Sequence, residues 1–215
     1  MSRRPGGAGG GGARPPVLVF VLGAAFLLLV VSLLIGSLAT PEFPPYALTV
    51  ADPLPRPVGD SLVGPTVYTL DASATDRWRY FDFSRNAAVD SAAAGEWDIA
   101  FRRFHLIAGA GGAGAGAGIV DLGPVAFDSV AELPADGYRG NVVGTDTTNP
   151  AVGKWYRYSM VSHLLASKRH VYGVRTADGK YAKLEILAYY CKDLGTACVS
   201  FRYAYQGDGT RRVAR

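Results

Sequence analysis

The chain has 215 residues, a length that suits one ordinary domain with appendages rather than two complete cores. Its net charge is +4, but three of its 22 basic residues, Arg3, Arg4 and Arg14, precede the first acidic residue. The remainder is therefore close to neutral, with 19 basic against 18 acidic residues. This balance excludes the concentrated basic face that nucleic acid binding requires.

The N-terminal part of the chain divides into a tail and an apolar segment. Residues 1–15 are rich in Gly and Arg, which predicts a disordered tail because this composition cannot bury apolar area. Residues 16–39 are predicted as a transmembrane helix, since Val17–Ala39 is 23 residues without a charge and reaches ~34 Å as a helix. A cleaved signal peptide is the alternative, although its apolar region usually has only about 7 to 15 residues.

The flanking charges predict an orientation for this span. Three Arg precede it, whereas the next basic residue is Arg56, 17 residues beyond Ala39. The N-terminus is therefore expected in the cytoplasm and the C-terminal domain in the periplasm, with the span in the cytoplasmic membrane of a bacterium. Ser32 and Gly36 form a small-xxx-small pair that suits packing against a neighbouring helix. Lipid and an integral membrane complex are thus the expected partners.

The remaining chain is predicted to be all-β. Residues 40–65 carry seven Pro, which favours an extended stalk or an edge wrap. Residues 66–210 alternate aromatic or β-branched with polar residues, as half-buried antiparallel strands do, with Trp97, Ile99 and Phe101 on one side of one such strand. A short basic tail, residues 211–215, ends the chain.

One hairpin is especially clear in the pattern. Asp178-Gly179 suits a tight turn between Tyr172–Arg175 and Tyr181–Tyr190, because Gly tolerates positive φ. In the second strand the alternation predicts one set of residues facing the core, Leu184, Ile186, Ala188 and Tyr190, and another facing water, Lys183 and Glu185. Ser159–Lys168 is the one segment beyond the span for which a helix is expected, on a weak pattern.

Two cysteines, Cys191 and Cys198, follow this hairpin at facing ends of neighbouring predicted strands. In an oxidising compartment an even count predicts a disulfide, which would close the short loop Lys192–Ala197. A zinc site normally needs four ligands, and no His lies in the same loop, so no metal site is predicted.

No enzyme is predicted. Ala108–Gly118 contains only Ala and Gly and matches G-x-G-x-x-G, but a strand-like segment follows it where a dinucleotide fold requires a helix. A loop between strands is the favoured interpretation. Asp98 and Asp121 lie in strand-like sequence without an evident partner, so turn or edge hydrogen bonding is expected of them. Signatures of nucleophilic or metal-dependent catalysis are absent from the sequence.

Histidine supplies the candidate ligand residues. The chain has His105, His163 and His170, and the first falls in an alternating strand, where a structural role is the default. His163 and His170 are seven apart and are candidates for axial ligation of a haem iron. Without a C-x-x-C-H motif, covalent haem attachment is not expected.

Several segments in order resemble the HmuY family. They are Glu96–Arg103, the Gly-rich turn, Ile119–Gly123, Lys154–Tyr158, Val171–Leu184 and Phe201–Tyr205. The resemblance covers residues 66–210 and implies an all-β fold of many short strands, and haem capture outside the cell through axial side chains such as His. No local motif carries a ligand role onto a particular residue.

Two functions follow from these observations. The preferred hypothesis is a non-enzymatic accessory subunit that stabilises the periplasmic face of an integral membrane complex, for example a respiratory or photosynthetic one. It requires no cofactor. The alternative is a tethered periplasmic haem-binding protein, for which haem is the ligand.

Overall fold

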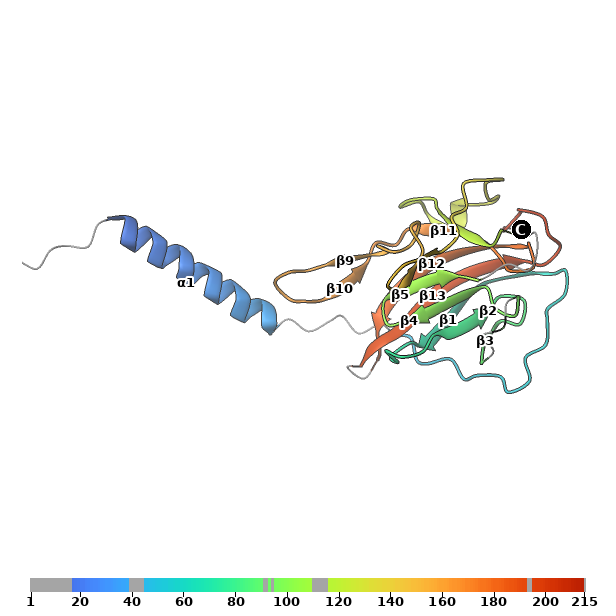
Figure 1. Cartoon of the computed structure of the whole chain (residues 1–215), viewed down its shortest axis with the longest axis horizontal. Helices are drawn as coiled ribbons and strands as arrows, with labels where there is room; N and C mark the ends of the chain where they lie inside the picture. The colour runs from blue at the N-terminus through green and yellow to red at the C-terminus, as the bar shows by residue number, and fades with distance from the viewer. Residues whose placement is uncertain are drawn as a thin grey trace, which may run out of the picture. The chain divides into compact units, whose positions relative to one another are not determined.

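The structure is a computed structural model, and it describes residues 17–38, 45–90, 93, 95–109, 116–192 and 195–214 (Figure 1). One helix in this part of the chain is long and apolar enough to cross a membrane: α1, Val17–Ser37. It falls inside the predicted span, residues 16–39. The predicted tail, residues 1–15, lies outside the described residues. The helix and the β-domain are described separately below.

Helix α1 is apolar around its whole circumference. It has no acidic residue in its first turn and no basic residue in its last, and nearly all of its large side chains are exposed. A helix with this composition is typical of a membrane or a buried environment rather than of a water-exposed surface. Ser32 and Gly36 lie one turn apart on the same face, and their packing role stays a prediction.

The β-domain consists of two main antiparallel sheets. One has five strands in the order β1-β13-β12-β11-β6, with the bounds Leu62–Asp71, Thr196–Gln206, Tyr181–Tyr190, Val171–Arg175 and Gly118–Asp121. The other has four in the order β3-β2-β4-β5, with the bounds Ala87–Val89, Arg79–Asp82, Ile99–Arg102 and His105–Ala108. Two short hairpins, β7–β8 (Val142–Val143, Thr147–Thr148) and β9–β10 (Tyr156–Tyr158, Leu165–Ser167), and a 3₁₀ helix, η1 (Phe127–Ser129), complete the domain.

Aromatic side chains from both sheets meet in one core. The ring of Phe201 on β13 lies 5.1 Å from that of Phe81 on β2 and 5.5 Å from that of Phe101 on β4, centre to centre. All three side chains are fully buried, and such ring pairs stabilise a core beyond their area alone. The predicted all-β fold is confirmed. The strand β6 also follows the Ala/Gly segment, as predicted, although residues 110–115 lie outside the described part.

The predicted hairpin is confirmed, but its faces are not as expected. Gly179 has φ +83° in the turn between β11 and β12. Lys183 and Glu185, predicted to face water, are only 3% and 4% exposed, so that prediction is wrong. The reason is that the second face of the sheet is covered as well: Lys183 Nζ donates to the carbonyl oxygens of Phe127 and Val130 at 3.0 and 2.8 Å.

The alternation also breaks near the end of β12. The register with β13 shifts between Ile186 and Ala188 and again between Ala188 and Tyr190. Such bulges place an extra residue in one strand and reverse the faces beyond it. Tyr189 is therefore buried, whereas Ala188 and Tyr190, both predicted to face the core, are only half-buried.

The helix expected at Ser159–Lys168 is not formed. Its second half is the strand β10, which pairs antiparallel with β9, Leu165 opposite Tyr158 and Ser167 opposite Tyr156. The strand β12 supplies further partners, since Leu165 N donates to the Tyr190 hydroxyl and Ser167 Oγ to the Ile186 carbonyl. These tertiary hydrogen bonds override a weak local helical pattern.

The Pro-rich segment and the C-terminus both lie along the β-domain. Thr49 N donates to Thr69 O and Val58 N to Ser84 O, at 3.0 and 2.7 Å, so residues 45–61 follow the domain as an edge wrap does. The strand β1 begins at Leu62, inside the predicted stalk. Beyond residue 210, Val213 is buried and its N–H donates to the carbonyl of Ala131.

The predicted disulfide between Cys191 and Cys198 is formed, with 4.8 Å between the two Cα atoms. It joins the end of β12 to β13 across a separation of seven residues. Because a crosslink restricts the unfolded chain, closing so short a loop contributes ~2.5 kcal/mol on the loop-entropy model.

We expect the Cys191→Ser, Cys198→Ser double variant to unfold with a free energy lower by about 2.5 kcal/mol, since its unfolded chain regains that loop entropy. Urea titration followed by circular dichroism measures the difference. Adding a thiol reductant to the wild type should lower its stability by a similar amount and leave the double variant unchanged. An effect of the reductant on the double variant would contradict the assignment.

Candidate functional site

The clearest polar constellation of the surface joins His170 to Asp121. His170 Nδ1 lies 3.0 Å from both carboxylate oxygens of Asp121, and both side chains are partly exposed. With the proton on Nδ1, the imidazole donates to the carboxylate and keeps its lone pair on Nε2. A carboxylate behind an imidazole in this way orients the ring and raises its basicity as a metal ligand.

Backbone pairing fixes the position of these two residues. Asp121 ends β6 and His170 directly precedes β11, and in the ladder Asp121 lies opposite Tyr172. Leu122 N donates to Val171 O, and Val171 N donates to the Gly123 carbonyl at 3.0 Å. Gly123 has φ +80°, a conformation that Gly adopts without strain. Its N–H also donates to Asp121 Oδ1, so the carboxylate is held in place.

His163 occupies a different part of the chain. It lies with φ +57° in the turn that joins β9 to β10, and its side chain is exposed. The paired strand β10 separates it from His170 along the chain, so each histidine is a separate candidate. Ligation of haem by either one stays a prediction.

One potential haem ligand was not among the residues predicted from the sequence. Met160 lies in the same turn as His163, and its side chain is 72% exposed. Methionine thioethers ligate haem iron together with His in some cytochromes. The feature of the sequence that could have identified this residue is its rarity, since Met160 is one of only two Met in the chain. The structure adds that it is exposed, which a core methionine would not be.

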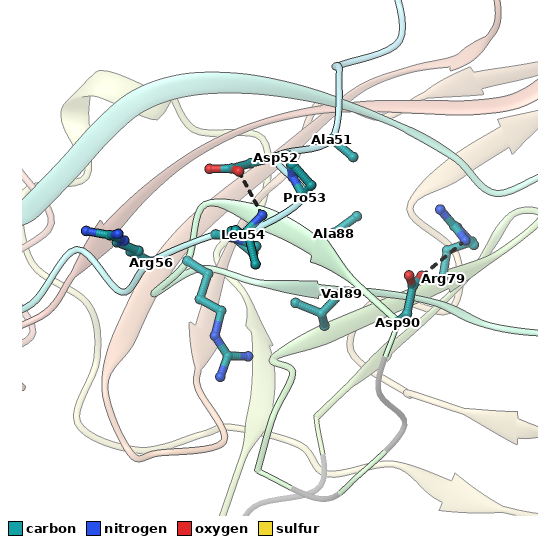
Figure 2. A pocket seen from close by; sticks show the side chains of 11 residues that line it. Ala51, Asp52, Pro53, Leu54, Arg56, Arg79, Ala88, Val89 and Asp90 are labelled. Carbon is teal, nitrogen blue, oxygen red and sulfur yellow. Dashed lines mark hydrogen bonds and ion pairs between the residues drawn. The ribbon is translucent and has the colours of Figure 1, made fainter.

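One pocket of the β-domain lies elsewhere and has different chemistry. It has a volume of about 660 Å³ and lies between residues 51–56 and the strands β2 and β3 (Figure 2). Its lining includes three Arg, of which Arg79 lies 3.7 Å from Asp90, but no His, Met, Cys or Tyr. It therefore offers charge to an anion and no side chain to a haem iron.

Asp98 is the most perturbed carboxyl group in the described residues, but it does not face a ligand site. It is 5% exposed, and burial, with a smaller contribution from Asp82, raises its pKa to about 7. Its Oδ2 accepts from Phe83 N and its Oδ1 from Ala177 N, both at 2.9 Å. Both oxygens are thus engaged by backbone, in line with the hydrogen-bonding role expected of this residue.

Fold and site together define a class: a two-sheet antiparallel β-domain that follows an apolar helix and carries a carboxylate-backed histidine at one sheet edge. The chain belongs to the HmuY family, because the model of that family, described as HmuY protein, matches residues 74–203. Among the residues described, no group of three or more His, Cys, Asp or Glu lies together as a metal site would.

Solved structures share the fold. The apo HmuY analog of Tannerella forsythia superposes with a TM-score of 0.57 at 17% identity, covering 69% of this chain and 98% of that one. A Bacteroides vulgatus protein described as HmuY-like and heme binding gives 0.53 at 18% identity, with 64% and 89% covered. A Bacteroides fragilis protein described as a lipoprotein gives 0.51 at 15%, with 64% and 86% covered. A search of curated proteins finds no match.

Proposed function

We propose that this chain is a haem-binding protein tethered to a membrane by α1, with its β-domain outside the cytoplasm. Membership of the HmuY family and the heme-binding description of one structural neighbour support haem as the ligand. The observation that carries the proposal is the pair of His170 and Asp121, with 3.0 Å between Nδ1 and the carboxylate. The accessory-subunit hypothesis stays a prediction, since the family and the fold favour the haem-binding alternative.

The residues at this site suit the ligand. Haem brings an iron that accepts an axial imidazole nitrogen. In this chain His170 would supply Nε2, and Asp121 would hold the ring with the proton on Nδ1. The side chain of His170 is only partly buried, at 24% exposed, so a ligand that arrives from solvent can approach it. The anchor and its orientation rest on α1 and on the Arg residues that precede it.

We expect titration of the full chain in detergent with haem to give a shifted Soret band. His170→Ala should remove the shift or weaken binding about 100-fold, and Asp121→Asn should weaken it about 10-fold, because an outer carboxylate typically contributes 10- to 100-fold to metal affinity. Absorbance at the Soret maximum measures both. The same titration of His163→Ala and Met160→Ala assigns the role of the turn residues.

His105→Ala is the matched control. His105 is also partly buried, but its ring stacks on Phe104 with 4.4 Å between the ring centres, and it is not part of the His170–Asp121 pair. Haem affinity should be unchanged in this variant. A wild type that leaves the Soret band of free haem unaltered contradicts the proposed function outright.

A further inference from the structure

The pocket between residues 51–56 and the strands β2 and β3 is built wholly from residues of the β-domain. Its volume of about 660 Å³ falls within the range of small-molecule sites, roughly 300–1,000 Å³. Charged residues make up the smaller part of its lining, and the larger part is apolar: Ala51, Pro53, Leu54, Pro55, Ala88 and Val89. An apolar wall with a few charged groups is typical of a site for a small organic molecule.

One wall of the pocket, residues 51–56, is held to the β-domain at both of its ends. Before it, Thr49 N donates to Thr69 O at 3.0 Å, and after it Val58 N donates to Ser84 O at 2.7 Å. Two of the six residues in between are Pro, whose rings fix φ. The wall is therefore restrained before a ligand arrives, which lowers the entropy that binding has to remove.

The three arginines of the pocket differ in how well their charges are neutralised. Arg85 Nη1 lies 3.1 Å from Asp82, whose side chain is only 10% exposed, so this guanidinium is held by the domain itself. Arg79 lies 3.7 Å from Asp90, and because the Asp90 side chain is 99% exposed, so long and hydrated a pair contributes little (Figure 2). Arg56 forms no ion pair with an acidic residue that the structure describes. Two guanidinium groups are thus available to a ligand.

Two carboxylates restrict the charge of that ligand. Asp52 and Asp90 both line the pocket, and both are exposed. With Arg85 balanced by Asp82, they bring the formal charge of the pocket close to zero. A dianion such as a phosphate ester would be repelled by both carboxylates, whereas a single carboxylate has to displace only the weakly held Asp90 from Arg79. A singly charged anion is therefore favoured.

We propose that this pocket binds an organic anion with one carboxylate and an apolar body. The planar guanidinium of Arg79 suits a bidentate pair with the carboxylate, and Arg56 adds a second positive charge. The apolar body would cover Leu54, which is 81% exposed, and Val89. The inference goes beyond haem binding and does not require it, since the pocket offers no side chain to a haem iron.

The test titrates naphthoate, a rigid carboxylate with an apolar body, into the full chain in detergent, with isothermal calorimetry as the readout and detergent alone as the blank. The neutral analogue naphthylmethanol should bind at least tenfold more weakly, because it loses the charge-assisted pair with guanidinium. Naphthyl phosphate should also bind more weakly at pH 8, where its second proton, with a pKa of about 6, is lost.

Variants of the pocket test the role of its charges. Arg79→Gln should weaken naphthoate binding about tenfold, and Asp90→Asn should strengthen it about threefold, because asparagine no longer competes for the guanidinium. Arg157→Gln is the matched control and should change nothing, since Arg157 is exposed and does not line the pocket. Far-ultraviolet circular dichroism checks the fold of each variant, and a misfolded Asp90→Asn would not gain affinity.

Heats no larger than those of detergent alone, or equal affinities for naphthoate and naphthylmethanol, would overturn the inference. So would tighter binding of the phosphate ester, or weaker naphthoate binding by Asp90→Asn. Haem titration separates this pocket from the proposed function: His170→Ala should keep naphthoate binding, and Arg79→Gln should keep the shifted Soret band. Displacement of haem by naphthoate would mean a single shared site and would also overturn the inference.

Discussion

Replacing Asp98 by Ala is expected to lower the free energy of unfolding by about 4 kcal/mol at about pH 5, among the largest single effects in this domain. The carboxylate accepts hydrogen bonds from the backbone of Phe83, which follows β2, and of Ala177, in the turn after β11. It therefore joins the two sheets at one point. Alanine would leave both buried N–H groups unpaired, at a cost of about 1–3 kcal/mol each.

The effect should depend on pH in a defined direction. The pKa of Asp98 is raised to about 7 in the folded chain, above its ordinary value near 3.8. A raised pKa means that the folded state holds the proton more tightly than the unfolded state. The stability from this group is thus fully present below about pH 4 and is lost as the pH rises through about 7. The cost of Asp98→Ala should accordingly shrink between about pH 5 and pH 8.

Urea unfolding at several pH values measures both effects. Asp98→Asn keeps the shape and cannot titrate, so it should lose the pH dependence that wild type owes to this group. Asp136→Ala is the matched control, because Asp136 is exposed and makes no hydrogen bond or ion pair with the residues that the structure describes. A cost of Asp98→Ala that grows with rising pH would contradict the raised pKa.

Local pattern was sufficient for much of the fold. The alternation around Trp97 and Phe101 identified a strand whose Phe101 is fully buried. Asp178-Gly179 identified its turn because the constraint is local: a tight hairpin needs positive φ at one residue. The cysteine pair was predictable for the same reason, since the two cysteines are only seven positions apart in the sequence.

The faces of β12 and the polar pairs were not predictable in this way. Period-2 alternation separates the two faces of a strand, but it does not say whether both are covered, and η1 covers the face that carries Lys183. The partner of His170 lies 49 residues away along the chain, at the end of β6. Only the order of strands in the sheet places Asp121 there, and that order is not written in any local motif.

Glu185, on the second face of β12, is the other position where a substitution is expected to cause a large loss of stability. This carboxylate is 4% exposed and lies between two guanidinium groups. Its Oε2 accepts from Arg202 Nε and Nη2 at 3.1 and 2.7 Å, and its Oε1 lies 2.8 Å from Arg169 Nε. The Arg202 guanidinium in turn lies 4.2 Å from the centre of the Phe127 ring, which fixes it beside η1.

Glu185→Ala should lower the free energy of unfolding by about 3 kcal/mol, because it leaves two arginines without their shared carboxylate. This expected loss of stability is near the lower end of the range for breaking a buried ion pair. The reason is that the side chains of Arg202 and Arg169 are 29% and 53% exposed, so water can hydrate both guanidinium groups once the carboxylate is gone. Urea titration of the variant measures the loss.

Glu132→Ala provides the comparison that isolates burial. Glu132 pairs with Arg211 at 3.0 Å, a distance like those around Glu185, but its side chain is 54% exposed. A surface pair of this kind contributes about 0–1 kcal/mol, so its loss should be small. Replacing Glu185 and Arg202 together by Leu should recover part of the stability, because desolvated charges then disappear on both sides. Equal losses for Glu185→Ala and Glu132→Ala would mean that the second face of β12 is open to water in solution.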